Sequence, residues 1–269
     1  MRVAYDLKMH PLSAVPRKIT RRARLAARAL AGSTASTGIH DDMDPAFAPR
    51  YRRAAPFTMT SIERMYAVWQ AVEYIGRARV PGDVVECGVW RGGSSMLAAL
   101  ALLHTGQERP MWLYDTYEGM TAPSERDRNW KGESAADRLA TQERIPGVFN
   151  DWAFATLDDV ERQMSTVEYP RNLLNLVRGP VERTIPSNCP RMISLLRLDT
   201  DWYESTRHEL QHLWPRLSVG GVLIIDDYGH WQGAREATDE FFAAQGLREM
   251  LHRIDYTGRL AIKLPSTVD

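Results

Sequence analysis

Short apolar runs alternate with amphipathic segments through most of the chain. The length of these runs and the turn signals beside them predict β-strands, and the helical periodicity between them predicts α-helices. Regular alternation of the two indicates a doubly wound α/β fold with a mostly parallel sheet. We expect strands over 84–89, 112–115, 173–177, 193–198 and 222–225, and helices over about 94–104, 204–214 and 231–244.

Further elements are expected at the borders of this alternating region. A helix begins near Thr60, because Thr60 and Glu63 have capping-box spacing and apolar residues follow at helical intervals. Residues 247–255 and 259–264 are β-like runs around a short glycine-containing turn, which predicts an antiparallel hairpin. The stretch 118–171 is long for a simple connection, and such insertions often serve as lids or substrate loops.

The N-terminal segment 1–44 differs in composition from the domain expected over 45–269. Residues 8–40 include no acidic side chain, and 32–38 are small and polar, which is typical of a flexible linker. The segment is either a lid that closes over an anionic ligand or a solvated basic tail. The missing acids and the linker favour the tail. Its clustered basic residues are Arg17, Lys18, Arg21, Arg22, Arg24 and Arg28.

Composition narrows the class of protein. A chain of 269 residues with 44% hydrophobic and 25% charged residues fits one globular α/β domain with additions. The formal net charge of zero gives no indication of nucleic-acid binding. Two cysteines, Cys87 and Cys189, provide neither a disulfide framework nor zinc-ligand spacing. We expect a cytoplasmic protein without membrane association, because the sequence shows neither a membrane-spanning run nor a secretory signal.

The turn after the first strand indicates a nucleotide-type cofactor. Glu86, Gly88 and Gly92 occur in E-C-G-V-W-R-G-G-S, and Ser94 opens the next helix, whose free N–H groups can bind a ligand. The spacing misses the G-x-G-x-x-G pattern of dinucleotide sites. An acid before the first glycine can instead face the cationic end of S-adenosylmethionine (SAM), although a purely structural turn is the alternative. Asp115 ends the second strand, where a carboxylate can accept from both ribose hydroxyls.

Acidic residues also follow the fourth and fifth predicted strands. Asp199 and Asp201 end one strand, and Asp226 and Asp227 end the next. Neighbouring strands lie roughly 5 Å apart, so these carboxylates would repel one another unless a hard divalent cation such as Mg²⁺ were bound. We assign Asp199, Asp226 and Asp227 to this metal and Asp199 also to the general base. Asp201 either joins them or caps the following helix, and surface acids without an ion are the alternative.

The acceptor side is less sharply defined. A metal that holds two oxygens favours a vicinal diol, so sugars and catechols are the natural acceptors. His230 follows the second acid pair and is a base, a substrate contact or an ordinary loop residue. Trp202 and Tyr117 lie on predicted loops near strand ends. Their rings are candidates for stacking on a sugar or on adenine, although loop aromatics also simply pack.

Four segments, taken together and in order, resemble the macrocin O-methyltransferase family. They are residues 86–94, 114–120, 198–205 and 225–228, and the resemblance extends over about 57–264. This family methylates sugar hydroxyls of antibiotics with SAM and Mg²⁺. The resemblance implies a class I SAM-methyltransferase fold, Rossmann-like with an antiparallel C-terminal hairpin. It also implies SAM contacts by Glu86, Gly88 and Asp115, metal binding by Asp199, Asp226 and Asp227, and Asp199 as the base.

These observations favour one function over three alternatives. We expect a metal-dependent O-methyltransferase that acts on a sugar hydroxyl of a glycosylated secondary metabolite, in a homodimer or larger homo-oligomer. A catechol or phenol O-methyltransferase uses the same chemistry. A non-catalytic partner subunit would not need the gathered acids, and a nicotinamide-dependent oxidoreductase lacks its glycine fingerprint.

Overall fold

The computed structural model describes residues 38–142 and 150–265. The chain divides into two compact units, Met1–Gly38 and Ile39–Asp269. Most of the predicted basic segment 1–44 therefore lies outside the described residues, and its role as tail or lid stays a prediction. All elements below belong to the second unit.

The described part of the chain contains a seven-stranded sheet in the order β3-β2-β1-β4-β5-β7-β6. Strands β1 to β5 are parallel, whereas β7 pairs antiparallel with both β5 and β6. The predicted parallel sheet with its antiparallel C-terminal hairpin is thus confirmed. The strands are β1 Asp83–Cys87, β2 Met111–Asp115, β3 Leu174–Arg178, β4 Ile193–Leu198, β5 Leu217–Ile225, β6 His252–Arg253 and β7 Arg259–Ile262.

Two strands depart most from their predicted bounds. The predicted run 247–255 forms strand β6 only over His252–Arg253. Strand β5 begins at Leu217, which pairs with Ile193, rather than at residue 222. The apolar pattern is broken by Gly220 and Gly221, but the Gly220 N–H donates to the Lys263 carbonyl at 2.8 Å and continues the ladder. Backbone hydrogen bonds extend this strand, and the hydropathy pattern alone could not predict them.

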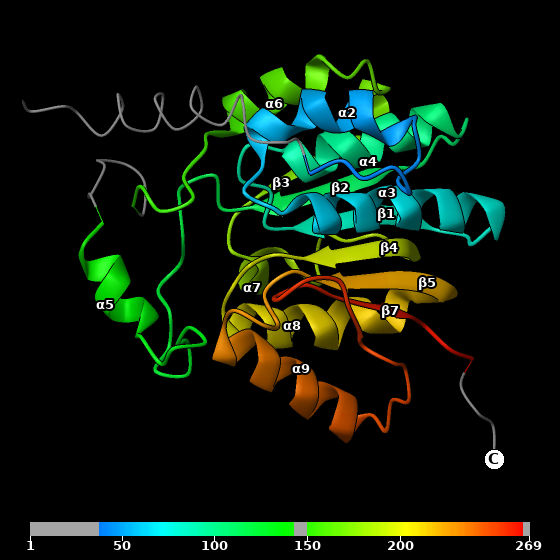
Figure 1. Ribbon diagram of the computed structural model, residues 1–269. Helices are drawn as coiled ribbons and strands as arrows, with labels where there is room; N and C mark the ends of the chain where they lie inside the picture. The colour runs from blue at the N-terminus through cyan, green and yellow to red at the C-terminus, as the bar shows by residue number, and fades with distance from the viewer. Residues whose placement is uncertain (1–37, 143–149, 266–269) are drawn as a thin grey trace, which may run out of the picture. The chain divides into compact units, whose positions relative to one another are not determined.

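Helices cover both faces of the sheet, as Figure 1 shows. α2, α3, α4 and α6 pack on one face, and α7, α8 and α9 pack on the other. The helices are α2 Phe47–Ala54, α3 Ile62–Arg77, α4 Gly93–His104, α5 Ala135–Ala140, α6 Leu157–Ser165, α7 Val181–Thr184, α8 Tyr203–Leu213 and α9 Gln232–Ala244.

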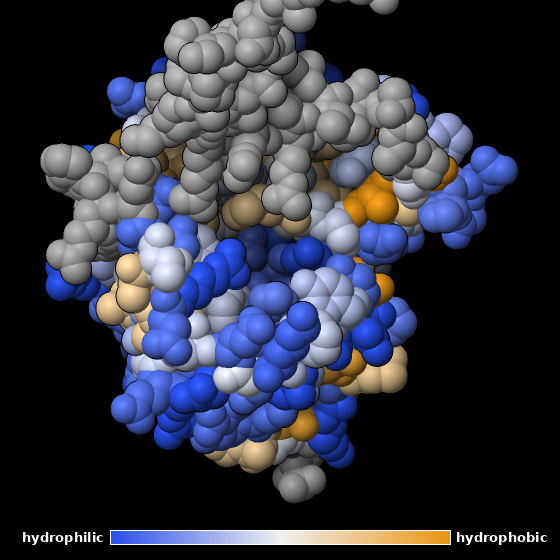
Figure 2. All heavy atoms as spheres, turned by 60° about the vertical axis from the view of Figure 1, so that its left-hand side comes forward, coloured by the Kyte–Doolittle hydropathy of each residue, from blue (hydrophilic) through white to orange (hydrophobic). Residues whose placement is uncertain are grey.

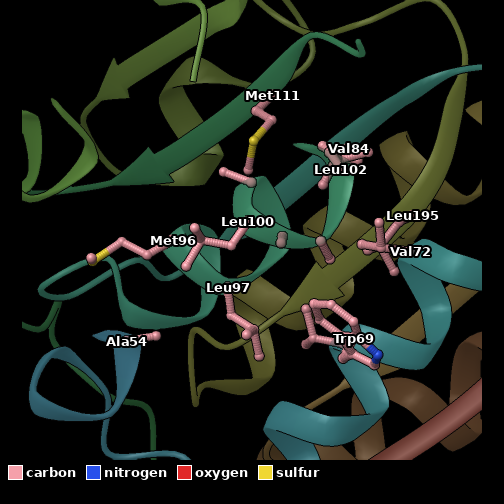
Figure 3. Packing of buried hydrophobic residues seen from close by; sticks show 14 of the residues in the cluster. Ala54, Trp69, Val72, Val84, Met96, Leu97, Leu100, Leu102, Met111 and Leu195 are labelled. Carbon is pink, nitrogen blue, oxygen red and sulfur yellow. The ribbon is translucent and has the colours of Figure 1, made fainter. Parts of the chain in front are cut away.

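The largest of the three core clusters in the described part of the chain fixes α3 and α4 against the sheet. Trp69 and Val72 of α3, Leu97 of α4, and Val84 and Leu195 of the strands meet in it (Figure 3). Trp69, Val72 and Leu97 are fully buried. Burial of each such side chain stabilises the fold by about 1.5–3 kcal/mol. This packing holds the strands, and therefore their carboxyl ends, in fixed positions.

One local prediction needs correction. The N-cap of α3 is Ser61, whose Oγ accepts the Arg64 N–H at 3.2 Å. Thr60, the predicted cap, lies one residue too early, and its hydroxyl instead accepts from Arg197 at 3.0 Å. The insertion 118–171 contains α5 and α6, and α6 buries Val160 in the main core, while the role of the insertion as a lid or substrate loop stays a prediction.

No helix within 38–142 or 150–265 is both long and apolar enough to span a membrane.

Candidate active site

Two adjoining pockets lie where the parallel strands end. Figure 2 shows a hollow with hydrophilic residues at its floor on this side of the molecule. The glycine-turn pocket is lined by Gly88, Asp115, Gly119, Gly179 and Val181, among others, and the acid pocket by Asp199, Asp226, Asp227, His230 and Trp231, among others. Both pockets share Met59, Trp90, Asp199 and Asp201. Ligands in the two pockets would therefore meet beside the acids of the β4 turn.

The glycine turn joins β1 to α4. Gly88 and Gly92 both have a φ of 85°, a left-handed conformation that glycine adopts without strain. Gly92 is the N-cap of α4, so the following N–H groups are free of intrahelical partners. Gly88 lines the glycine-turn pocket, and Ser94 in the first turn of α4 lines the acid pocket. The predicted turn is present in the structure, with a helix N-terminus directed to the site.

Asp115 is held at the end of β2 by backbone donors. One carboxylate oxygen accepts from the Val89 and Trp90 N–H groups at 2.7 and 2.9 Å. The other accepts from the Tyr117 N–H at 2.8 Å. Burial raises the pKa of Asp115, while these N–H donors act against the rise. The side chain lines the glycine-turn pocket at the position predicted for a ribose contact.

Glu86 occupies a more enclosed position than the sequence suggested. It is 4% exposed, and its two carboxylate oxygens accept from the hydroxyls of Ser94 and Ser95. Arg197 Nη1 lies 2.6 Å from Oε1 of the same carboxylate. Glu86 lines neither of the two pockets, so its predicted contact with SAM stays untested by this arrangement.

The predicted metal ligands converge at the ends of β4 and β5. Asp199, Asp226 and Asp227 each offer a carboxylate oxygen, and these oxygens lie within 4.8 Å of one another. Burial, followed by neighbouring carboxylates, raises the pKa of Asp199 and Asp227 well above the usual range, although Arg197 counteracts the rise at Asp199. Clustered oxygen donors whose charges oppose one another fit a hard divalent cation.

One of the two roles predicted for Asp201 was to cap α8, and the structure shows that it does not. The cap is supplied by Asp127 of the insertion, which accepts the Tyr203 N–H at 2.8 Å. Asp201 has a φ of 68°, and its own N–H donates to Asp227 at 3.3 Å. Burial, together with the charge of nearby Asp199, raises the pKa of Asp201 to about 7. Its carboxylate belongs to the acid pocket.

Two arginines that sequence reasoning missed neutralise part of this acidity. Arg197 in β4 is 3% exposed and lies 2.8 Å from Asp199 and 2.6 Å from Asp226. Arg64 of α3 forms a close ion pair with the other oxygen of Asp226 and lies 3.0 Å from Asp255. Arg64 lines the acid pocket, whereas Arg197 approaches the acids from the protein interior. A charged residue inside an apolar strand was the available signal for Arg197.

The predicted aromatic contacts divide between pocket and core. His230 lines the acid pocket with Trp231, and its Nδ1 lies 3.1 Å from the Tyr256 hydroxyl. Tyr117, however, is 3% exposed and donates back to the Leu113 carbonyl at 3.1 Å. Trp202 is 2% exposed and packs edge-on against Trp231. Neither Tyr117 nor Trp202 lines the two pockets, and both rings pack against the protein, so their substrate contact stays a prediction.

Comparison with known proteins agrees with this geometry. Residues 13–261 match the family model described as macrocin-O-methyltransferase (TylF). A Streptomyces olivaceus protein named 8-demethyl-8-(2,3-dimethoxy-alpha-L-rhamnosyl)-tetracenomycin-C 4'-O-methyltransferase is 32% identical over 81% of this chain and 79% of its own length. Demethyldecarbamoylnovobiocin O-methyltransferase of Streptomyces niveus is 31% identical over 75% of this chain and 73% of its own length.

A solved structure supports the same assignment. The O-methyltransferase NovP is 28% identical, with a TM-score of 0.68, over 91% of this chain and 100% of that one. The family match covers most of the sequence, including both glycine-turn and acid-pocket residues. The chain therefore belongs to the macrocin O-methyltransferase family and is a SAM-dependent O-methyltransferase.

Proposed function

We propose that this enzyme methylates a sugar hydroxyl of a glycosylated secondary metabolite and that it requires a divalent metal ion, most simply Mg²⁺. The observation that carries the proposal is the cluster of Asp199, Asp226 and Asp227, whose oxygens lie within 4.8 Å of one another. The acid pocket that contains this cluster adjoins the glycine-turn pocket. A methyl donor in one pocket would therefore face an activated hydroxyl in the other.

The glycine-turn pocket is proposed to hold SAM. Gly88 lines this pocket, and Gly92 is the N-cap of α4, whose N-terminus with Ser94 can bind the carboxylate of SAM. Asp115 accepts hydrogen bonds from the ribose hydroxyls. Asp115 and Gly88 line the glycine-turn pocket, which supports this division, and Ser94 lines the adjoining acid pocket.

The metal is proposed to bind Asp199, Asp226 and Asp227. A divalent ion there would lower the pKa of a bound hydroxyl and fix its direction. The chain's own contribution is to hold the acids in place, since Arg197 and Arg64 each grip one oxygen of Asp226. Trp231, which is 4% exposed, forms part of the wall of the acid pocket.

Asp199 is proposed to take the proton from the acceptor hydroxyl. Its side chain is 27% exposed and lines both pockets, so it can reach a hydroxyl placed between them. Asp201 also lines both pockets and is the rival candidate. Comparing Asp199→Asn with Asp201→Asn separates the two roles, because only Asp199 is assigned to the metal as well.

The acceptor is proposed to be a glycoside that carries a vicinal diol. Named relatives act on a rhamnosyl tetracenomycin and on a demethyldecarbamoylnovobiocin, which supports a glycosylated natural product. The acid pocket has an aromatic wall, formed by Trp152 and Trp231, that is proposed to contact the sugar ring. His230 beside this wall is proposed to contact the acceptor.

The test combines a substrate panel with metal removal. Purified enzyme and SAM are incubated with deoxysugar glycosides or with catechols, with Mg²⁺ or with EDTA, and S-adenosylhomocysteine (SAH) and methylated product are followed by mass spectrometry. We expect turnover of a glycoside that EDTA abolishes and Mg²⁺ restores. Asp199→Asn should lose turnover by at least about 100-fold while still binding SAH. Turnover of catechols alone, or full activity in EDTA, would refute the acceptor or the metal requirement respectively.

A further inference from the structure

A buried ion pair lies behind the glycine turn and the acid cluster. Glu86 of β1 and Arg197 of β4 face each other in the strand register, and Arg197 Nη1 lies 2.6 Å from Glu86 Oε1. The two side chains are 4% and 3% exposed. The same guanidinium reaches Asp199 at 2.8 Å and Asp226 at 2.6 Å. One cation thus joins three carboxylates from three neighbouring strands.

The position of this pair differs from that of a ligand-binding residue. Glu86 and Arg197 line neither the glycine-turn pocket nor the acid pocket. The Glu86 oxygens are already engaged by Ser94, Ser95 and Arg197. Glu86 thus has three protein partners and lines no part of the pocket proposed for the cofactor.

We propose that Glu86 and Arg197 are positioning residues for the metal-binding carboxylates and that Glu86 does not contact the cofactor. Arg197 orients Asp199 and Asp226 from behind, and Glu86 keeps the guanidinium in place. This inference rests on the proposed metal site. It assigns Glu86 to the support of the metal site rather than to the binding of SAM.

The electrostatics give the direction of each effect. Without the charge of Glu86, Arg197 keeps its positive charge and draws more strongly on Asp199 and Asp226, so a second cation binds there less well. Lysine at position 197 keeps the charge but replaces a planar fork with a single ammonium group, which cannot hold all three carboxylates. Both changes should therefore weaken metal binding, and neither touches the glycine-turn pocket.

The experiment measures metal and cofactor binding separately in the full-length protein. Isothermal titration with Mn²⁺ alone, and with SAH alone, is carried out on wild type, Glu86→Gln and Arg197→Lys. The matched controls are Asp83→Asn, at the other end of β1 with a hydrogen bond to Trp112, and Arg109→Lys, whose guanidinium binds the Val80 and Gly82 carbonyls. Thermal unfolding of each variant reports any general loss of stability.

We expect Glu86→Gln and Arg197→Lys to raise the Mn²⁺ Kd by about tenfold or more, the range found for residues behind metal ligands, with the SAH Kd within about threefold of wild type. The controls should keep both affinities even where their melting temperatures fall. If Arg197→Lys does not fold, Glu86→Gln decides alone.

A tenfold loss of SAH affinity in Glu86→Gln with unchanged Mn²⁺ binding would overturn the inference, because Glu86 would then serve the cofactor. Variants that bind Mn²⁺ as wild type does would overturn it while the proposed function stands. A wild type that binds SAH but not Mn²⁺ would refute the metal requirement itself, and the inference with it.

Discussion

Replacing Gly88 with alanine tests how closely the glycine turn and the acid turn are built together. Gly88 has a φ of 85° and lies directly below the backbone of Asp199. A methyl group there would overlap the Asp199 carbonyl oxygen and lie 2.5 Å from its carbonyl carbon. The obstacle is backbone within the β1–β4 pairing, so no side chain can rotate away.

The expected loss in the free energy of unfolding of Gly88→Ala has two parts. A left-handed φ costs an alanine about 1–2 kcal/mol, and overpacking against atoms that cannot relax adds roughly 1–3 kcal/mol. The sum, roughly 2–5 kcal/mol, should lower the melting temperature by about 5–20 °C. The matched control is Gly106→Ala, because Gly106 has a φ of 65° with nothing within 4 Å of an added methyl group. It isolates the first part, about 1–2 kcal/mol.

The assay is chemical unfolding of both variants together with SAH titration. Because relief of the overlap must displace Asp199, Gly88→Ala should also lose SAH affinity by at least about tenfold, whereas Gly106→Ala should bind as wild type does. Equal stability losses in the two variants, with wild-type SAH binding in both, would refute the packing argument.

Three further predictions concern single side chains. Asp115→Asn should raise the SAH Kd by about tenfold or more, because one acceptor becomes a donor, while Asp83→Asn leaves it unchanged in the same titration. Burial raises the pKa of Glu209 well above its usual 4.5, so the stability it contributes is complete below that value and is lost as the pH rises through the folded-state pKa. Glu209→Gln should therefore gain stability relative to wild type between pH 5 and pH 8 in urea unfolding, and parallel curves would contradict this. Burial lowers the pKa of His230 below 6.5, so His230→Ala should raise the acceptor KM without changing the shape of the pH–rate profile above that pH.

The fold could be predicted because burial on both faces leaves a simple signature. A strand covered by helices on both sides is mostly apolar, as in β4, where all six residues are buried and all but Ser194 and Arg197 are Ile or Leu. The proximity of the acids after β4 and β5 could also be predicted, because the carboxyl ends of neighbouring parallel strands lie at one edge of the sheet. The homo-oligomer and the basic N-terminal segment, by contrast, stay predictions.

Aromatic residues near the site could not be assigned from sequence, because loop geometry decides where a ring lies. Tyr117 adopts a φ of 55°, and its ring returns to the strand that it follows. Trp202 packs with Trp152, which comes from the insertion 50 positions earlier, through an edge-on contact 5.4 Å between ring centroids. Neither the turn nor the long-range contact is visible in a local pattern.

Arg197 and Arg64 show where further prediction from sequence is feasible and where it ends. Glu86 and Arg197 each stand two residues before the first residue of their strand's turn, Gly88 or Asp199. Parallel strands that end together must therefore pair them, and burial requires such charges to be paired. Arg64 offers no comparable rule, because its partner depends on how α3 docks against the sheet. Register can thus identify the ion pair behind the acids, whereas the arginine that enters the acid pocket required the tertiary structure.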